Sequence, residues 1–350
     1  MKTIFLESHN IQNPYFGFGQ FNFHLLKGLA KIDHPEYEIV VHATDISKLR
    51  KEFGNLFRYK KYHSLRRHNY FRIREKYDLW HSMNQNTKIE PYHRIPYLLT
   101  VHDVHFASEN NQKRIALFKE KLDRATAITY ISEFAKKETE SFFEIPNVPQ
   151  YVIYNGNPIT DFLDTSTFES NFIGKRPFLY SIGDFLERKN FHSLVEMMRF
   201  LPDFNLIISG NNNKAYGEKI KNLINQHHLE NQVFLTGRVD EMEKQYYLKN
   251  CTAFVFPSLR EGFGLPPIEA MKFGKPVFLS NKTSLPEIGA DAAYYWENFD
   301  PEYMKDILLE GLTHYKSQQE KQEKLLINRA NFFDWEKAAK QYSEIYKSLI

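Results

Sequence analysis

The chain has little cysteine and no long apolar run. One residue of 350, Cys251, is a cysteine, which excludes a disulfide framework and fits a reducing compartment. No window of the sequence approaches the roughly 18 consecutive apolar residues that a membrane-spanning helix requires. The first residues, Met1–Glu7, become charged too early for a signal peptide and are typical of a buried strand. We therefore expect a cytoplasmic protein.

The remaining composition is that of a soluble globular protein. Apolar residues make up 42% of the chain and charged residues 25%, so enough apolar side chain is present to fill a core, and disorder is excluded for the bulk of the chain. At about 150 residues per domain, the length predicts two domains.

The formal net charge of +3 is small, but the charges are unevenly distributed. Between Lys48 and Lys76 eleven Lys and Arg residues stand against two acids, a local charge of +9 that leaves −6 for the rest of the chain. Aromatic residues are interleaved with these cations. Such a stretch suits an anionic lipid surface, where each cation contributes about 1 kcal/mol. It would equally serve nucleic acid or form a solvated variable face, and these alternatives stay open.

Short apolar runs rich in Val, Ile, Leu and Phe alternate with stretches of helical length. Runs that are apolar on both faces indicate parallel strands covered by helices, and two such sets predict two doubly wound α/β domains. Turn-forming residues cluster between 155 and 177, where we place the boundary. The strands are expected at Thr3–Leu6, Glu38–His42, Tyr97–Val101, Ala127–Ile131, Val152–Tyr154, Phe178–Ile182, Asn205–Ser209, Val233–Thr236, Ala253–Phe256, Pro276–Leu279 and Ala293–Trp296.

The densest group of candidate functional residues is Ser258–Ala270, directly after the expected strand at Ala253–Phe256. Ligands of doubly wound sheets bind at the carboxyl ends of the strands. Gly262 and Gly264 let backbone N–H groups approach a ligand closely, and the start of the following helix favours an anion such as a diphosphate.

Two carboxylates flank these glycines, and two cations follow an earlier strand. Glu261 and Glu269 are suited to accept hydrogen bonds from hydroxyls of a sugar and a ribose. The alternative is a glycine-rich turn with Glu269 in the first helical turn, where the helix dipole stabilises an acid. Arg188 and Lys189 suit a diphosphate leaving group, because a guanidinium binds phosphate through two bonds and an ammonium acts as a point charge. An ordinary solvated pair is the alternative there.

The same residues resemble a known family. The segment Glu261–Met271 is similar to the Glu-x7-Glu motif of retaining, nucleotide-sugar-dependent glycosyltransferases of family 4. The resemblance extends along almost the whole chain, with its motifs in the same order. The further matching segments are Gly17–Gly19, Val101–Asp103, Ile131–Phe134, Val152–Gly156, Tyr180–Asp184, Glu187–Asn190, Leu235–Val239, Gly274–Val277 and Ser284–Glu287.

The resemblance implies the GT-B architecture, in which two Rossmann-like domains face an interdomain cleft. Residues 1–160 would bind the acceptor, with a C-terminal helix at 335–350 packing back on them, and residues 161–334 would bind the nucleotide-sugar. It implies catalytic roles for Glu261, His102, Arg188 and Lys189, with Glu261 holding hydroxyls of the donor sugar. The residues that it assigns to donor binding are Gly17, Gly19, Arg238, Val239, Gly262, Phe263, Gly264, Leu265 and Glu269, of which Glu269 would hold the ribose.

Other motifs are incomplete or absent. Gly17-Phe18-Gly19 lacks the third glycine of the dinucleotide fingerprint, because Asn22 stands there, so NAD is not expected. His102 and His105 have a His-x-x-His spacing without a third ligand, and the sequence contains no Asp-x-Asp, so we expect neither a metal nor a cofactor. The sequence also has no Gly-x-Ser-x-Gly elbow, Walker loop or Cys-x-x-Cys, and we expect Cys251 to be a core residue.

The reaction implied is transfer of a hexose to an acceptor hydroxyl with retention, by a front-side path in which the departing phosphate takes the acceptor's proton. Ser284–Glu287 is most similar to mannosyltransferases of surface-polysaccharide assembly, which favours GDP-mannose over a UDP-sugar. The basic stretch favours a glycan or lipid-linked acceptor and peripheral attachment at the inner face of the cell membrane, with no nucleic acid partner. The rival functions are a disaccharide synthase or phosphorylase of similar fold, and a nucleotide-sugar-binding protein without activity.

Overall fold

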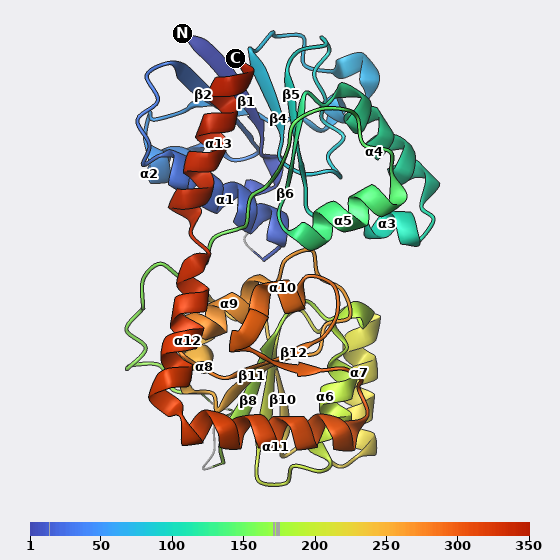
Figure 1. The fold of residues 1–350 in the computed structure, drawn as a ribbon, viewed down its shortest axis with the longest axis vertical. Coiled ribbons are helices and arrows are strands. Elements are labelled where there is room, and N and C mark those ends of the chain that lie inside the picture. The colour runs from blue at the N-terminus through green and yellow to red at the C-terminus, as the bar shows by residue number, and fades with distance from the viewer. Residues whose placement is uncertain (14, 171, 173–175) are drawn as a thin grey trace. The chain divides into compact units, whose positions relative to one another are not determined.

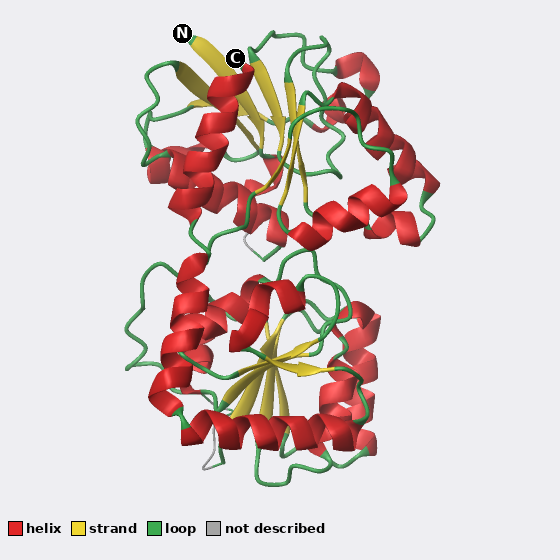
Figure 2. Cartoon of the chain, viewed as in Figure 1, coloured by secondary structure: helices red, strands yellow, loops and turns green. Residues whose placement is uncertain are grey.

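Two compact units make up the chain. The computed structural model describes residues 1–13, 15–170, 172 and 176–350. Unit 1 comprises Met1–Pro158 together with Asp334–Ile350, and unit 2 comprises Ile159–Phe333. The chain thus leaves unit 1 within the expected boundary segment 155–177, two residues before the domain end expected at 160. Each unit is a parallel sheet flanked by helices (Figure 2). The predicted fold class, two doubly wound α/β domains, is confirmed.

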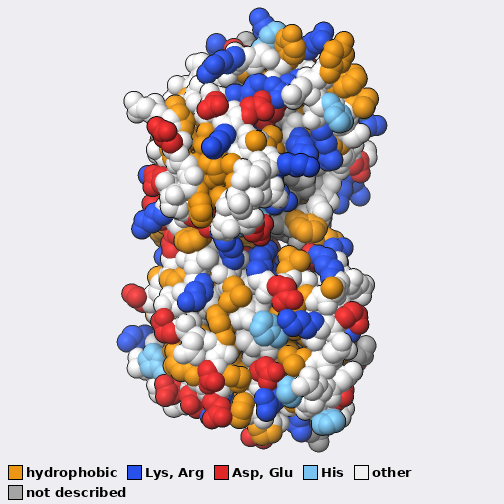
Figure 3. Space-filling model, turned by 90° about the vertical axis from the view of Figure 1, so that its right-hand side faces the viewer, with side chains coloured by type: hydrophobic (Ala, Val, Ile, Leu, Met, Phe, Trp, Pro, Cys, Tyr) orange, Lys and Arg blue, Asp and Glu red, His pale blue; other side chains and the backbone are white. Residues whose placement is uncertain are grey.

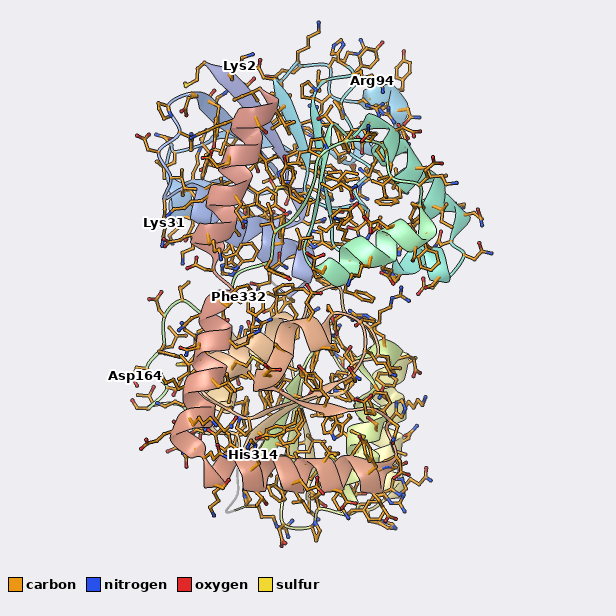
Figure 4. The ribbon with its side chains drawn as sticks, in the orientation of Figure 1. Lys2, Lys31, Arg94, Asp164, His314 and Phe332 are labelled. Carbon is orange, nitrogen blue, oxygen red and sulfur yellow. The ribbon has the colours of Figure 1, made fainter. Side chains whose placement is uncertain are left out.

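Within the described residues, the sheet of unit 1 has seven parallel strands in the order β3-β2-β1-β4-β5-β6-β7. The strand order changes direction between β1 and β4, which is where ligands of such sheets bind, beyond the carboxyl ends. Lys2 and Arg94, labelled in Figure 4, lie at the opposite end of the strands, the amino end, where β1 and β5 begin. The bounds are β1 (Lys2–Glu7), β2 (Tyr37–Ala43), β3 (Arg58–Lys61), β4 (Leu79–Ser82), β5 (Tyr97–Val101), β6 (Ala127–Tyr130) and β7 (Gln150–Val152).

The sequence pattern missed β3 and β4, and it placed β7 two residues too late. β3 is an edge strand whose charged side chains are exposed or half-buried, so it contains no apolar run. β4 is central and buried, but His81 and Ser82 interrupt its apolar character. His81 is accommodated because both ring nitrogens have partners, the Tyr346 hydroxyl and the Thr100 Oγ1, each at 2.8 Å.

Helices α1 (Gly17–Leu29) and α13 (Trp335–Leu349) lie side by side on one face of this sheet (Figure 1). Gly28 permits their close approach, since a Cβ at that position would lie 2.7 Å from the Ala339 Cβ. Tyr37 on β2 hydrogen-bonds Ser343 on α13 at 2.7 Å. The last segment of the chain is therefore part of the core of unit 1. The other helices of unit 1 are α2 (Ile46–Phe53), α3 (His105–Ser108), α4 (Gln112–Arg124) and α5 (Glu133–Phe142), with short 3-10 helices at His9–Gln12, Ser64–Arg67 and Asn69–Phe71.

The strands described for unit 2 form a six-stranded parallel sheet in the order β10-β9-β8-β11-β12-β13. Its strands are β8 (Phe178–Ile182), β9 (Asn205–Ser209), β10 (Val233–Gly237), β11 (Ala253–Phe256), β12 (Val277–Ser280) and β13 (Tyr294–Trp296). The helices are α6 (Phe191–Met198), α7 (Ala215–Gln226), α8 (Glu241–Asn250), α9 (Leu265–Lys272), α10 (Leu285–Gly289), α11 (Pro301–Ser317) and α12 (Gln319–Phe332). Two apolar clusters, one around α6 and α7 and one around α8 and α9, form its core. None of the helices in the described part of the chain is long and apolar enough to cross a membrane.

The basic stretch at 48–76 is built partly into unit 1. Its aromatic residues do not all form a surface, because Phe53 and Phe57 are buried. Three of its cations have acidic partners: Arg58 pairs with Glu38, Lys60 with Glu75 and Arg72 with Glu120. The free surface is therefore smaller than the composition indicates.

Candidate active site

Glu261 lies in the loop between β11 and α9, beyond the carboxyl end of β11. Its Oε1 accepts three hydrogen bonds, from Ser258 Oγ at 2.6 Å, Lys189 Nζ at 2.6 Å and Arg188 Nη1 at 3.2 Å. Both cations belong to a 3-10 helix, Glu187–Lys189, that follows β8, the neighbour of β11 in the sheet. Because adjacent parallel strands end at the same edge, the sheet brings together three residues that the sequence predicted separately.

The Glu261 carboxylate is ionised at neutral pH. Burial alone would raise its pKa, but the charges of Lys189 and Arg188 and the hydrogen bonds from Lys189 and Ser258 together lower it below its usual value. Lys189 is also buried, and its Nζ lies 4.7 Å from the centroid of the Phe256 ring. Two cations share one carboxylate, so the cluster keeps a surplus positive charge that suits a phosphate.

Two residues ahead of α10 hold the Glu261 loop in place. Thr283 Oγ1 accepts a hydrogen bond from the Glu261 amide at 3.1 Å, and Ser284 Oγ donates to the carbonyls of Glu261 and Phe263 at 3.0 and 2.7 Å. Thr283 has a φ of 55°, a left-handed conformation that a β-branched residue rarely adopts. Strain of this kind persists where the surrounding structure over-determines the backbone, as it does in many functional loops.

Gly264 ends the same loop and precedes the first residue of α9. Its φ of 117° lies in the region that favours glycine, and a Cβ there would lie 2.9 Å from Leu285 Cδ2. This conformation turns the chain into α9, whose second and third residues, Pro266 and Pro267, have no backbone N–H.

We expect Gly264→Ala to weaken nucleotide binding about tenfold, because a side chain in this conformation costs about 1–2 kcal/mol and shifts the loop that carries Glu261. Gly54→Ala is the control. Gly54 also has a positive φ of 57° but meets nothing within 4 Å, and it belongs to unit 1. Titration calorimetry with a nucleoside diphosphate should show the loss of affinity in G264A and not in G54A. Equal losses in both variants would mean that Gly264 contributes stability and not a binding geometry.

Glu269 is buried in α9, where its Oε1 accepts a hydrogen bond from Lys244 Nζ on α8 at 2.8 Å. It is the fifth residue of the helix, outside the first turn, which contains no acid. The alternative that Glu269 serves the helix dipole from the first turn is therefore wrong. Arg238 and Val239 follow the edge strand β10 at the same carboxyl edge of the sheet, and their donor-binding roles stay predictions.

In unit 1 the two predicted glycines, Gly17 and Gly19, flank a residue that contacts His102. Gly17 is the first residue of α1 and faces open space, whereas a Cβ at Gly19 would lie 1.9 Å from the Asn13 carbonyl oxygen. Gly19 thus allows the preceding loop to pack against the helix, and Gly17 leaves the helix start accessible. Between them in sequence, the ring of Phe18 stands edge-on to His102 at 4.8 Å.

His102 is a neutral, oriented imidazole. Its Nε2 lies 2.9 Å from the Met83 carbonyl oxygen, which can only accept, so Nε2 carries the proton and Nδ1 is left as an acceptor. Burial lowers the pKa of His102 to about 4. At neutral pH His102 can accept a hydrogen bond from a hydroxyl, but it cannot supply positive charge.

We expect unit 1 to lose stability as the pH falls from about 6.5 toward about 4. Burial lowers the pKa of His81 to about 3 and that of His102 to about 4, so across this range only the unfolded chain, whose histidines titrate near 6.5, takes up protons. Each histidine contributes a slope of up to about 1.4 kcal/mol per pH unit, and the loss levels off below the folded pKa values. Urea unfolding at several pH values would measure the slope, which His81→Gln should reduce. A stability independent of pH across this range would contradict the assignment.

The other candidate residues have structural partners. His105 Nδ1 lies 2.5 Å from Asp103 Oδ1, and no group of three or more His, Cys, Asp or Glu among the described residues could hold a metal ion. Cys251 is buried, and burial raises the pKa of its thiol to about 12. The expectation that it is a core residue is confirmed.

Two family models match consecutive parts of the chain. Residues 17–159 match the model described as Glycosyltransferase Family 4, and residues 164–331 match the model described as Glycosyl transferases group 1. The chain belongs to the family 4 glycosyltransferases. The family resemblance of its motifs is thereby confirmed.

Relatives and solved structures agree with this membership. The glycosyltransferase is 26% identical to the O-antigen chain mannosyltransferase B of Escherichia coli, with both chains covered fully, and 27% identical to the O-antigen chain mannosyltransferase RfbU of Salmonella typhimurium over 61% of each. Sucrose-phosphate synthase from Thermosynechococcus elongatus superimposes with a TM-score of 0.77 at 18% identity, covering 100% of this chain and 99% of that one. Anabaena HepE, in complex with UDP and glucose, gives 0.71 at 17% identity, covering 99% and 100%. These structures share the GT-B fold.

Reasoning from sequence assigned no role to the residues that support the predicted ones, although Ser258 and Ser284 lie in the candidate segments. Thr283 and Ser284 hold the loop, and Ser258 hydrogen-bonds the Glu261 carboxylate. Lys244 left a readable signal, because on α8 it shares a helical face with the buried Tyr247 and Leu248, at the i, i+3 and i+4 positions. A lysine among such positions indicates a buried acidic partner.

Proposed function

We propose that this glycosyltransferase transfers a hexose from a nucleotide-sugar to an acceptor hydroxyl with retention, and that its donor is GDP-mannose. The observation that carries the proposal is the Glu261 carboxylate held by Ser258, Lys189 and Arg188 at the edge of the sheet of unit 2. The names of two similar proteins, both O-antigen chain mannosyltransferases, support mannose as the sugar and a surface glycan as the acceptor.

Arg188, Lys189, Glu261 and His102 have distinct tasks in the proposed reaction. Arg188 and Lys189 bind the diphosphate and stabilise the negative charge that develops as the sugar–phosphate bond breaks. Glu261 Oε1 is occupied by three donors, so its second oxygen is the one to accept hydrogen bonds from sugar hydroxyls. In unit 1, His102 accepts a hydrogen bond from a substrate hydroxyl through Nδ1.

Retention follows from a front-side path. The acceptor oxygen bonds to the anomeric carbon on the face that the diphosphate leaves, and the acceptor's proton passes to the departing phosphate oxygen. Glu261 is a poor nucleophile for a covalent alternative, because two cations and a hydroxyl already bind its carboxylate. We also propose that the reaction needs no metal, since Arg188 and Lys189 supply the positive charge that a metal ion would bring to the diphosphate.

Thermal-shift titration tests the donor. GDP, UDP, GDP-mannose and UDP-glucose are each added with and without EDTA, and a ligand at 100 times its Kd should stabilise the protein by about 2.7 kcal/mol. We expect GDP and GDP-mannose to act, with no effect of EDTA. A thermal shift with the UDP compounds alone would mean that the donor is a UDP-sugar and not GDP-mannose. Loss of the shift in EDTA would mean that donor binding needs a metal ion.

Product analysis tests the reaction class. The anomeric proton signal of the product should show the same configuration as the donor. An inverted product would refute the front-side path. Turnover that needs inorganic phosphate or a sugar phosphate in place of a nucleotide-sugar would establish the rival phosphorylase function, and donor binding without turnover would establish a non-enzymatic role.

We further propose that unit 1 attaches to the inner face of the cell membrane through the basic stretch. Eight of its eleven cations have no carboxylate within 4.0 Å among the described residues. Leu65, Tyr70 and Phe71 are 57%, 80% and 49% exposed between them. Figure 3 shows cationic and apolar side chains interspersed on one face of unit 1. Exposed aromatic residues among unpaired cations are suited to the interface of an anionic bilayer.

Vesicle co-sedimentation tests this attachment. We expect Arg66→Ala/Arg67→Ala to weaken binding to phosphatidylglycerol vesicles about 30-fold, since each cation near the surface contributes about 1 kcal/mol. Lys316→Ala/Lys324→Ala, on exposed positions of α11 and α12 in unit 2, is the matched control and should change binding less than about twofold. The proposal would be refuted if wild-type protein did not sediment with anionic vesicles at low salt, or if it bound RNA and not the vesicles.

A further inference from the structure

Lys244 is a buried cation next to Glu269, the carboxylate that was predicted to hold the ribose of the nucleotide. Its Nζ lies 2.8 Å from Glu269 Oε1 and 2.9 Å from Glu241 Oε2. The two acids differ, because the side chain of Glu269 is 7% exposed and that of Glu241 is 52% exposed. Among the described residues, Lys244 is the one side chain that donates a hydrogen bond to Glu269.

This arrangement is an inefficient way to stabilise a fold. Removing two charges from water costs several kcal/mol per ion, and apolar residues of similar volume often stabilise a protein as well or better. Tyr247 and Leu248 on the same helix show that apolar residues fit this environment. The pair is therefore better explained by what it does to Glu269.

Lys244 constrains Glu269 in two ways. It provides a counter-charge for a carboxylate in a buried place, and it occupies Oε1, so that Oε2 is left to accept hydrogen bonds. A carboxylate that a cation holds in place before a ligand arrives loses little entropy on binding and accepts strong hydrogen bonds. The pKa of Lys244 is consistent with a side chain that stays protonated. Burial would lower this pKa, but Glu269 and Glu241 together raise it above its usual value.

We propose that Lys244 is the positioning residue for ribose recognition, holding Glu269 so that its free oxygen receives the ribose hydroxyls of the nucleotide. This inference rests on the proposed function, because it takes the ligand of Glu269 to be a nucleotide. Lys244 acts through Glu269 and has no separate contact with the reacting atoms.

The test compares a ribonucleotide with the same nucleotide lacking its ribose hydroxyls. Calorimetry measures the Kd of GDP and of 2′,3′-dideoxy-GDP, or of the uridine pair if wild-type protein binds UDP more tightly. Wild-type protein should prefer the ribonucleotide about 10- to 100-fold, the range that hydrogen bonds to a charged group provide. Lys244→Met should reduce this preference to less than about threefold by weakening ribonucleotide binding alone.

Three further variants separate positioning from a general structural effect. Lys244→Arg keeps the charge and should restore most of the preference, and Glu241→Gln removes the exposed partner and should leave it unchanged. In a Glu269→Gln background, which itself loses the preference, Lys244→Met should have no further effect. If K244M does not fold, Lys244→Gln keeps a hydrogen-bond donor without the charge, and its preference should fall between wild type and none.

A preference retained in K244M, or equal losses for both nucleotides, would overturn the inference and leave the proposed function standing. Wild-type protein that binds a nucleotide without any preference for the ribose hydroxyls would have the same meaning. The proposed function fails on a different result, namely no binding of either nucleotide to wild-type protein.

Discussion

Glu261→Gln should lower the rate of sugar transfer by about 10²- to 10³-fold while GDP binds as tightly as before or more tightly. The two effects have one cause. The amide keeps the size of the side chain but removes the negative charge that balances Arg188 and Lys189. Sugar hydroxyls then lose a charged acceptor that acts as the transition state forms, and such preorganised groups commonly contribute about 2.7–4 kcal/mol. The diphosphate gains, because the two cations no longer share their charge with a carboxylate.

Steady-state kinetics together with GDP calorimetry would measure both effects. Lys189→Met should have the opposite effect on GDP binding. It removes a cation, so it should weaken GDP binding and also lower the rate of transfer. Ser258→Ala removes one of the three hydrogen bonds to Glu261 and should cost less than about tenfold in rate. An E261Q variant that keeps more than about a tenth of the transfer rate would show that this carboxylate is not part of the machinery.

Tyr346→Ala should destabilise unit 1 by about 3–5 kcal/mol, as large-to-small changes of buried aromatic residues do. Tyr346 is fully buried on α13, and its hydroxyl hydrogen-bonds His81 Nδ1 on β4 at 2.8 Å. The truncation leaves a cavity between α13 and the sheet and also leaves a buried ring nitrogen without its partner. Residues 334–350 belong to unit 1 although they follow unit 2 in the sequence. If α13 is released from unit 1, the apolar face beneath it should become exposed.

Urea unfolding would measure the loss in the free energy of unfolding. One further variant separates the contribution of the hydroxyl from that of the ring, and another serves as the control. Tyr346→Phe keeps the ring and should cost about 1–2 kcal/mol, the value of the hydroxyl and its partner. Lys340→Ala, at an exposed position of the same helix, should change stability by less than about 0.5 kcal/mol. A loss below about 1 kcal/mol in Y346A would mean that α13 contributes little to unit 1.

Much of this protein could be predicted from local sequence. The parallel strands of both sheets were found wherever a buried strand is apolar along its length, as in Tyr97–Val101 and Phe178–Ile182. The Glu261 loop was found because its glycines, prolines and acids stand in a short segment whose spacing has a direct meaning. The meeting of Glu261 with Arg188 and Lys189 was not predictable in this way, because it depends on β8 lying beside β11 in the folded sheet.

The tertiary structure alone decided which residues support these elements. β4 is a strand because Tyr346 and Thr100 satisfy His81 from far along the chain, and a window around His81 contains neither partner. Lys244 became part of the site by its contact with Glu269, 25 positions away. The same holds for the basic stretch, where burial of Phe53 and pairing of Arg72 removed residues that composition counted as surface. Local sequence determines backbone preference and periodicity, which act over a few residues. Partners for buried polar groups come from wherever the folded chain passes, so only the packed structure shows them.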